Sequence, residues 1–178
     1  MSEEIHLIES PADASKALVS ALADLLEEAV EGGASLGYLY QTPRSVYEKF
    51  WQGEIADLST STGFILVASL GGSSVGVVQC AFATKETGSH RAEVRKLLVK
   101  KTLRGQGIAT QLMKALESEA LARGRSLLYL DTERNSDADF LYPKLGWSEF
   151  GVIPRYAAAP NGVLADCTFY YKELSELI

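Results

Sequence analysis

The sequence is poor in the residues that bind metals or cross-link a small fold. It contains 2 cysteines, 2 histidines and 5 prolines among 178 residues. Cys80 and Cys167 lie in separate apolar runs, and the sequence has no Cys-x-x-Cys pair or Cys/His cluster. We therefore expect both thiols to be buried and unreactive, and we expect no metal site.

Two further absences concern membranes and net positive charge. No apolar run approaches the roughly 18 residues of a membrane-spanning helix. The N-terminal stretch MSEEIHLIES lacks a signal-peptide pattern, so we expect a cytoplasmic protein. The 17 Lys and Arg face 23 Asp and Glu, for a net charge of −6. Because nucleic acids and anionic membranes bind basic surfaces, we expect neither as a partner.

What remains is the composition of an ordinary globular protein, 47% hydrophobic and 22% charged, whose length favours one domain over residues 1–178. Alternation predicts a strand over residues 4–10. Ser10 and Pro11 then predict a helix start, and leucines at helical spacing continue the helix to Gly32. A second helix is expected from Pro43 to about residue 60.

The centre of the chain predicts a sheet. Residues 63–70 and 75–84 flank GGSS as a β-hairpin, and residues 91–101 form a third strand. Within it, Arg95 and Lys96 interrupt the alternation, which predicts a β-bulge. A helix is then expected from near Gly107 to Gly124, followed by a central strand over residues 126–131 that is covered on both faces. A short helix follows over residues 137–147. The last two strands, over residues 148–153 and 166–174, are separated by a loop over residues 154–164.

The stretch LRGQGIATQLM, residues 103–113, predicts an anion site. A strand ends just before it, and an apolar helical pattern follows it. The first backbone N–H groups of a helix lack partners and lie at the positive end of its dipole. Glycine permits close approach to a phosphate, and Arg104 can add a charged hydrogen bond.

Two kinds of phosphate ligand are compatible with this turn. One is a dinucleotide or S-adenosylmethionine in a Rossmann-like unit, because the turn begins as G-x-G-x-x and Asp131 ends the next strand. Against it, Thr110 replaces the third glycine, and a hairpin and a third strand precede the turn. The other ligand is coenzyme A, bound either by an enzyme or by a non-catalytic acyl-CoA-binding module.

Two motifs favour coenzyme A. Residues 104–109, RGQGIA, fit (Gln or Arg)-x-x-Gly-x-(Gly or Ala), and residues 135–147, NSDADFLYPKLGW, fit N-x-x-A-x-x-x-Y-x-K-x-G-(F/W). In this order they resemble the motifs of the GNAT superfamily of acyl-CoA N-acyltransferases. The stretches 32–38, 91–99, 127–133 and 154–162 are further similar to tabtoxin-resistance acetyltransferases, members that acetylate an amino-acid-like β-lactam toxin.

The resemblance implies a fold and a reaction. The expected fold is mixed α/β (α+β), with a central seven-stranded mixed sheet, about four helices, and a splay between the fourth and fifth strands. The expected activity is transfer of an acetyl group from acetyl-CoA, a co-substrate, to the primary amine of a small molecule by direct attack on the thioester. Relatives are often dimers, so a homodimer is one expectation.

The reaction requires a base, because an ammonium has no lone pair. Glu93 and Asp131 lie on strands expected to be parallel neighbours, and the resemblance also implies acids at these positions. Other roles stay open: a salt bridge of Glu93 with Arg91 or Arg95, a cap or loop hydrogen bond for Asp131, or binding of the ammonium by both.

The resemblance assigns the remaining roles by position. Tyr142 would protonate the departing thiolate, and Asn135 would hydrogen-bond the pantetheine arm. The backbone of Leu97, Leu98 and Val99 would pair with pantetheine amides. Tyr38 and Tyr156 would line the acceptor pocket. The diphosphate would lie on a loop made of Arg104, Gly105, Gln106, Gly107, Ile108, Ala109 and Thr110.

Overall fold

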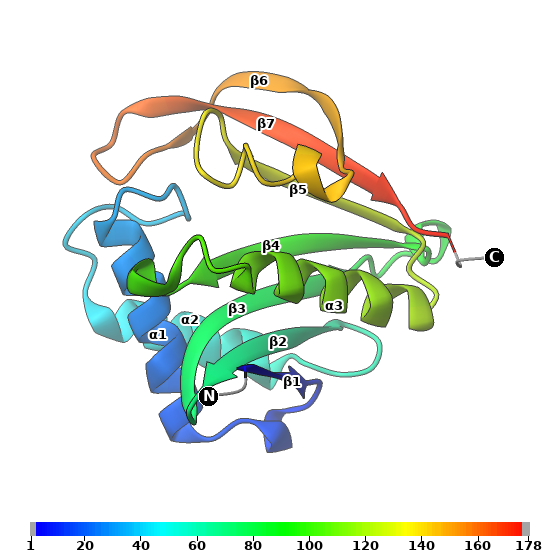
Figure 1. Cartoon of the computed structure of the whole chain (residues 1–178), viewed down its shortest axis with the longest axis horizontal. Helices are drawn as coiled ribbons and strands as arrows, with labels where there is room; N and C mark the ends of the chain where they lie inside the picture. Colours follow the sequence, from blue (N-terminus) through cyan, green and yellow to red (C-terminus); the bar gives the residue numbers. More distant parts are fainter. Residues whose placement is uncertain (1–2, 176–178) are drawn as a thin grey trace.

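The computed structural model describes residues 3–175, which form seven strands and three α-helices with short 3-10 turns (Figure 1). The strands are β1 (Glu3–Ile8), β2 (Gly63–Leu70), β3 (Ser73–Phe82), β4 (Arg91–Val99), β5 (Leu127–Glu133), β6 (Ser148–Ala158) and β7 (Leu164–Glu173). The helices are α1 (Lys16–Glu31), α2 (Arg44–Ala56) and α3 (Ile108–Ala122).

All seven strands belong to one mixed sheet in the order β1-β2-β3-β4-β5-β7-β6. Only β4 and β5 pair in parallel, and they pair over Arg91–Glu93 and Leu127–Tyr129 alone. Beyond Glu93 the two strands diverge toward their carboxyl ends (Figure 1). The predicted seven-stranded mixed sheet with a splay between its fourth and fifth strands is confirmed.

Apolar clusters fill the two faces of the sheet. One cluster packs α3, through Leu112 and Leu116, onto residues such as Val94 of β4 and Leu128 of β5. The other packs α1 and α2 onto the opposite face. Figure 1 shows α3 crossing one side of β3 and β4, with α2 on the other side. The sheet beside the splay between β4 and β5 therefore has α3 on one face and α1 and α2 on the other.

The predicted β-bulge in β4 is confirmed. Lys96 has the left-handed φ of 54°, and the register between β3 and β4 shifts at Val77/Gln79. The bulge reverses the alternation of side chains along the strand. Before it, Val94 packs into the α3 cluster; after it, Leu98 packs into the α1/α2 cluster. Glu93 and Arg95, which alternate with Val94, therefore lie on the α1/α2 side.

Two helix predictions were wrong in detail. Ser10 does not start α1, because Asp13 accepts hydrogen bonds from the backbone N–H groups of Glu9 and Ser10 and closes a separate 3-10 turn. The helix begins at Lys16, with Ser15 as its cap. The expected fourth helix is only a 3-10 turn, Pro143–Leu145, since proline has no N–H to continue a helical ladder.

Two strand predictions also need correction. The loop expected over residues 154–164 is mostly strand, because β6 continues to Ala158 and tolerates Pro154 beside a register shift between Ile153 and Ala157. β5 is central but not covered on both faces. Its Tyr129 is 40% exposed, since neither α1 nor α2 extends over this part of the sheet.

Candidate active site

The glycine turn has the geometry of an anion site. Gly105 and Gly107 have φ values of 75° and 89°, and Gly107 is the residue that caps α3. A Cβ atom built at either glycine would meet no atom within 4 Å. Within the described residues, the N–H groups of residues 105–110 donate to no protein carbonyl, and Gln111 is the first to bond back, to Gly107. The amides are thus available to a ligand.

Arg104 and the edge of β4 lie beside these amides. The Arg104 Nε donates to the carbonyl of Val99 at 3.2 Å, which fixes the end of β4 against the turn. On its other side, β4 pairs with β3 through Leu98 and Val99. Because β5 pairs no further than Glu93, residues 97–99 face the splay without a strand partner there. An extended amide-containing ligand has space to pair at this edge.

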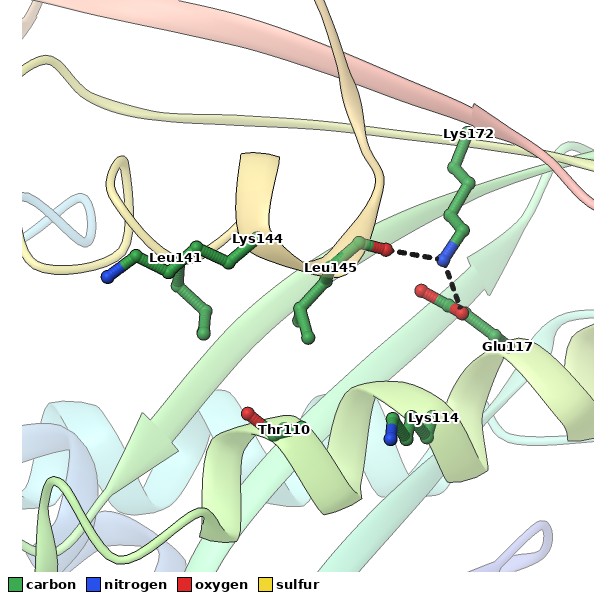
Figure 2. Close-up of a pocket in the computed structure, with 7 residues that line it drawn as sticks. All are labelled: Thr110, Lys114, Glu117, Leu141, Lys144, Leu145 and Lys172. Carbon is green, nitrogen blue, oxygen red and sulfur yellow. Dashed lines mark hydrogen bonds and ion pairs between the residues drawn. The ribbon is translucent and has the colours of Figure 1, made fainter.

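A cavity of about 390 Å³ lies between α3 and the segment after β5 (Figure 2). Lys172 and Glu117 close one end of it with an ion pair of 2.7 Å. Among the described residues Lys114 and Lys144 form no ion pair, and their ammonium groups carry net positive charge at the cavity wall. The motifs did not assign them a role. The lining residues are Thr110, Lys114, Glu117, Leu141, Lys144, Leu145 and Lys172.

The two predicted acids come together on the other face of the splay. Glu93 lies opposite Tyr129 in the parallel register, and Asp131 follows two residues later on the same face of β5. Desolvation raises the pKa of Glu93, and the Asp131 charge raises it further, while Arg95 and Lys96 oppose the shift. Solvent reaches Asp131, yet the surrounding protein displaces enough water to raise its pKa also.

Arg95 does not pair with Glu93. Its Nη2 atom lies 3.1 Å from Glu54 Oε2 on α2, and the same oxygen accepts a hydrogen bond from Gln79. Gln79 is only 2% exposed, and its Oε1 atom has no partner within the described part of the chain. Arg95 therefore pairs with Glu54, and the Glu93 carboxylate has no ion-pair partner among residues 3–175. An unpaired carboxylate is suited to binding a cationic ligand.

Lys96 completes the charged cluster, which we define as Glu54, Glu93, Arg95, Lys96 and Asp131. Its Nζ donates to the carbonyl of Leu36 at 3.1 Å and lies 5.2 Å from the centre of the Phe50 ring. Desolvation lowers the pKa of Lys96, and the charge of Arg95 lowers it further. The three carboxylates of the cluster oppose this shift. With three acids and two bases, the cluster has a net charge of −1, which a bound ammonium would neutralise.

Sequence reasoning missed Glu54 and Gln79 entirely and treated Lys96 only as part of a bulge. Glu54 lies 25 residues from Gln79 and 41 from Arg95. No local pattern signals contacts of that range. The irregular Arg95–Lys96 pair was the one available signal, because bulges often reorient side chains next to active sites.

Tyr142 is buried, 5.5 Å from the ring of Tyr170 and 5.8 Å from that of Trp147. Burial raises its pKa, and the charge of Asp131 contributes to the rise. The phenol therefore holds its proton at neutral pH. Asn135, by contrast, is exposed in a left-handed turn whose backbone N–H donates to Asp139 at 2.7 Å.

The two predicted pocket tyrosines lie in different surroundings. Tyr38 is half-buried, with its ring 5.0 Å from Tyr47 in an edge-on contact. Tyr156 is 51% exposed and contacts Phe169, which is paired with Asp131 in the sheet register.

Cys80 and Cys167 are both buried, as predicted, and desolvation raises their pKa values to about 12 and about 11. Over residues 3–175, no group of three or more His, Cys, Asp or Glu side chains could hold a metal ion. Within the same range, no helix is long and apolar enough to cross a membrane.

The chain belongs to the Acetyltransferase (GNAT) family, which residues 20–147 match. Its sheet is the GNAT fold, in which four antiparallel strands, β1 to β4, precede the glycine turn. The Rossmann-like alternative, with the turn in an early βαβ unit, is therefore wrong.

Two curated relatives match part of the chain. An uncharacterized N-acetyltransferase in the hisH-hisA intergenic region of Azospirillum brasilense is 29% identical over 62% of this chain and 65% of its own length. The bS18-alanine N-acetyltransferase of Haemophilus ducreyi is 32% identical over 46% of this chain and 57% of its own. The chain thus spans less than two thirds of the length of either relative.

Solved structures share the fold over nearly the whole chain. The ribosomal-protein-alanine N-acetyltransferase of Brucella melitensis is 23% identical, with a TM-score of 0.77 over 96% of this chain and 99% of that one. A Salmonella typhimurium protein, solved with its cofactor acetyl-CoA, is 18% identical, with a TM-score of 0.78 over 100% and 97%. These likenesses concern the fold alone.

Proposed function

We propose that this chain, as a single domain, is an acetyl-CoA-dependent N-acetyltransferase that acetylates the primary amine of a small molecule. One observation carries the proposal. The splay between β4 and β5 has free helix-start amides on one side and the partly desolvated Glu93 and Asp131 on the other. An anionic donor and a cationic acceptor can therefore approach the same gap from opposite faces.

The residues on the α3 side fit coenzyme A. The amides of residues 105–110 match a diphosphate, and the free edge at 97–99 matches the pantetheine amides. Arg104 would add a charged hydrogen bond to the diphosphate, and Asn135 would hydrogen-bond the pantetheine arm. Lys114 and Lys144 would attract the remaining phosphate at the cavity wall. When bound, acetyl-CoA supplies an activated acyl group as a thioester.

Glu93 and Asp131 would bind the acceptor ammonium and take its proton. An ordinary carboxylate is a weak base for an amine, but desolvation raises the pKa of both groups and makes them stronger bases. Arg95 and Lys96 limit the rise for Glu93. The deprotonated amine then attacks the thioester carbonyl directly.

Tyr142 would donate its proton to the sulfur atom that leaves. Burial raises its pKa, so the phenol is protonated when the step requires it. The charge of Asp131 acts on the Tyr142 hydroxyl, which supports a position near the splay, and its ring packs in the α3 cluster. The backbone N–H groups of residues 97–99 are the donors best placed to polarise the thioester carbonyl.

The acceptor we favour is an amino-acid-like amine, and the similarity to tabtoxin-resistance enzymes makes such a toxin the first compound to test. The relatives from Haemophilus ducreyi and Brucella melitensis act on ribosomal-protein alanine according to their names, so a protein amine is the second candidate. A homodimer is the assembly that we propose for the enzyme.

The decisive experiment measures transfer of labelled acetyl from acetyl-CoA to a panel of amines, with wild type and Glu93→Gln. Turnover of at least one amine that Glu93→Gln reduces is the expected result. Calorimetry with coenzyme A, NAD and S-adenosylmethionine gives an independent readout, and only coenzyme A should bind. Coenzyme binding with no turnover on any amine would favour a non-catalytic acyl-CoA-binding module.

A further inference from the structure

Glu54 of α2 holds the Arg95 side chain on the α1/α2 face of the sheet. Its Oε2 atom lies 3.1 Å from Arg95 Nη2 and accepts a second hydrogen bond from Gln79 Nε2. Gln79 and Arg95 are register partners on β3 and β4, so the two donors approach the carboxylate from neighbouring strands. One oxygen atom of Glu54 thus joins α2 to both strands.

The packing of α2 fixes the position of Glu54. Trp51, one helical turn earlier, is fully buried and donates its Nε1–H to the carbonyl of Leu22 at 2.9 Å. Ile55, the next residue after Glu54, is buried as well. The Glu54 side chain is 25% exposed, so the protein shields much of it from water. Because α2 is anchored on both sides of Glu54, the carboxylate can hold Arg95 in one place.

Arg95 has a second possible partner on its own strand. Glu93 and Arg95 are two residues apart before the bulge, so their side chains leave the same face of β4 roughly 7 Å apart. A long guanidinium side chain can cover that separation. In the described part of the chain, however, no ion pair joins the two, and the buried Nε of Arg95 has no partner. Two carboxylates compete for Arg95, and Glu54 is the one that binds it.

The charges around Glu93 show why this competition matters. Arg95 and Lys96 of β4 lower the pKa of Glu93. Asp131 of β5 and Glu54 of α2 raise it. Among these four charges, Arg95 has the largest effect although it is paired with another residue, and Glu54 has the smallest direct effect. The main influence of Glu54 on Glu93 is therefore expected to act through the position of Arg95.

We infer that Glu54 is a positioning residue that holds the guanidinium of Arg95 away from Glu93, and thereby keeps the Glu93 carboxylate free to take a proton from the acceptor amine. The inference rests on the proposed function, because it concerns the base of that reaction. If Arg95 turned to Glu93, the new ion pair would make the carboxylate a weaker base and would occupy it against a cationic ligand.

The test is a cycle of variants: Glu54→Gln, Arg95→Met and the two combined. Glu54→Gln keeps the shape of the side chain and a hydrogen-bond acceptor, and it removes the charge. Glu48→Gln is the matched control, because Glu48 lies on the same helix and pairs with Arg44 instead. Carbon-13 NMR of glutamate-labelled protein follows the Glu93 carboxyl directly, and the spectrum of Glu93→Gln assigns its signal.

We expect Glu54→Gln to lower the pKa of Glu93, because the released Arg95 pairs with it. The fall should be at least about twice as large as in the Arg95→Met background, where only the lost charge of Glu54 acts. Glu48→Gln should leave this pKa unchanged. A base of lower pKa is ionised at lower pH but takes a proton less readily. The pH–rate profile of Glu54→Gln should therefore rise at lower pH, to a plateau kcat about threefold lower.

Two results overturn the inference: an unchanged Glu93 pKa in folded Glu54→Gln, or an equal fall with and without Arg95. Circular dichroism establishes folding. If Glu54→Gln does not fold, Glu54→Asp replaces it, because it shortens the reach to Arg95 and keeps the charge on α2, and the same two results decide. The NMR titration needs no substrate. A wild type that acetylates no amine therefore overturns the proposed function, while the titration separately decides whether Glu54 holds Arg95 away from Glu93.

Discussion

The two faces of the sheet at the splay differ in the polar and charged groups that they present. On the α3 face, the side chains are apolar and the anion-binding groups are backbone amides and two lysines at the cavity wall. On the α1/α2 face, the charged cluster and Gln79 replace part of the apolar core. Backbone amides suit a permanent anion, whereas carboxylates suit an amine that must lose a proton.

The bulge in β4 makes this division possible within one strand. Without it, the residues after Arg95 would keep the alternation of those before it. With it, Val94 packs toward α3, while Glu93, Lys96 and Leu98 all lie toward α1 and α2. One strand thus serves the proposed donor site through its backbone edge and the acceptor site through its side chains.

The largest expected effect follows from removing both acids on the α1/α2 face. The double variant Glu93→Gln, Asp131→Asn should lower kcat by about 100-fold or more, the usual contribution of general base catalysis. The KM for acetyl-CoA should stay within about twofold, because the donor binds on the other face. Steady-state kinetics with both substrates tests this, with exposed Glu86→Gln as control. A comparable loss of donor affinity would contradict the division between the faces.

The next effect tests the α3 face. Gly107→Ala places a side chain at φ 89°, where left-handed backbone costs roughly 1–2 kcal/mol, so acetyl-CoA affinity should fall by about tenfold. Gly124→Ala is a matched control: its φ is 73° and it also has open space around it, but it follows α3. Calorimetry with coenzyme A should separate the two variants. Equal affinities would argue against diphosphate binding at the turn.

Tyr142 tests the connection between the faces. Tyr142→Phe keeps the ring contacts with Trp147 and Tyr170 and removes the proton donor. We expect kcat to fall by about tenfold with little change in either KM. Tyr171→Phe, on an exposed tyrosine of β7, is the control. An unchanged kcat would assign Tyr142 to packing alone.

The smallest effect is a shift in pH dependence. Because the base must be ionised, kcat should rise with pH through the raised pKa values of Glu93 and Asp131. The charge of Lys96 lowers both pKa values, so Lys96→Met should move this rise to higher pH. The change is visible in a pH–rate profile measured at saturating acetyl-CoA. A shift to lower pH would mean that Lys96 does not act on these carboxylates.

The predictable parts of the molecule were those set by local chemistry. Gly105 and Gly107 identified the turn before α3, and the adjacent Arg95 and Lys96 identified the bulge. Local patterns failed where two local solutions compete: Asp13 closes a 3-10 turn at Ser10, and Pro143 stops a helix that the spacing favours. The roles of Glu54 and Gln79 depend on contacts between α2, β3 and β4, which no short stretch contains.

The register shift opposite Lys96 has a consequence for how this fold can vary. A regular ladder can slip by two residues and keep the same side chains on each face. β3 and β4 cannot do so, because the extra residue of the bulge in β4 has to stay opposite the register shift between Val77 and Gln79 of β3. The bulge therefore fixes the register of this strand pair. The hydrogen bonds that Gln79 and Arg95 donate to Glu54 therefore retain their spacing even where insertions lengthen the surrounding loops.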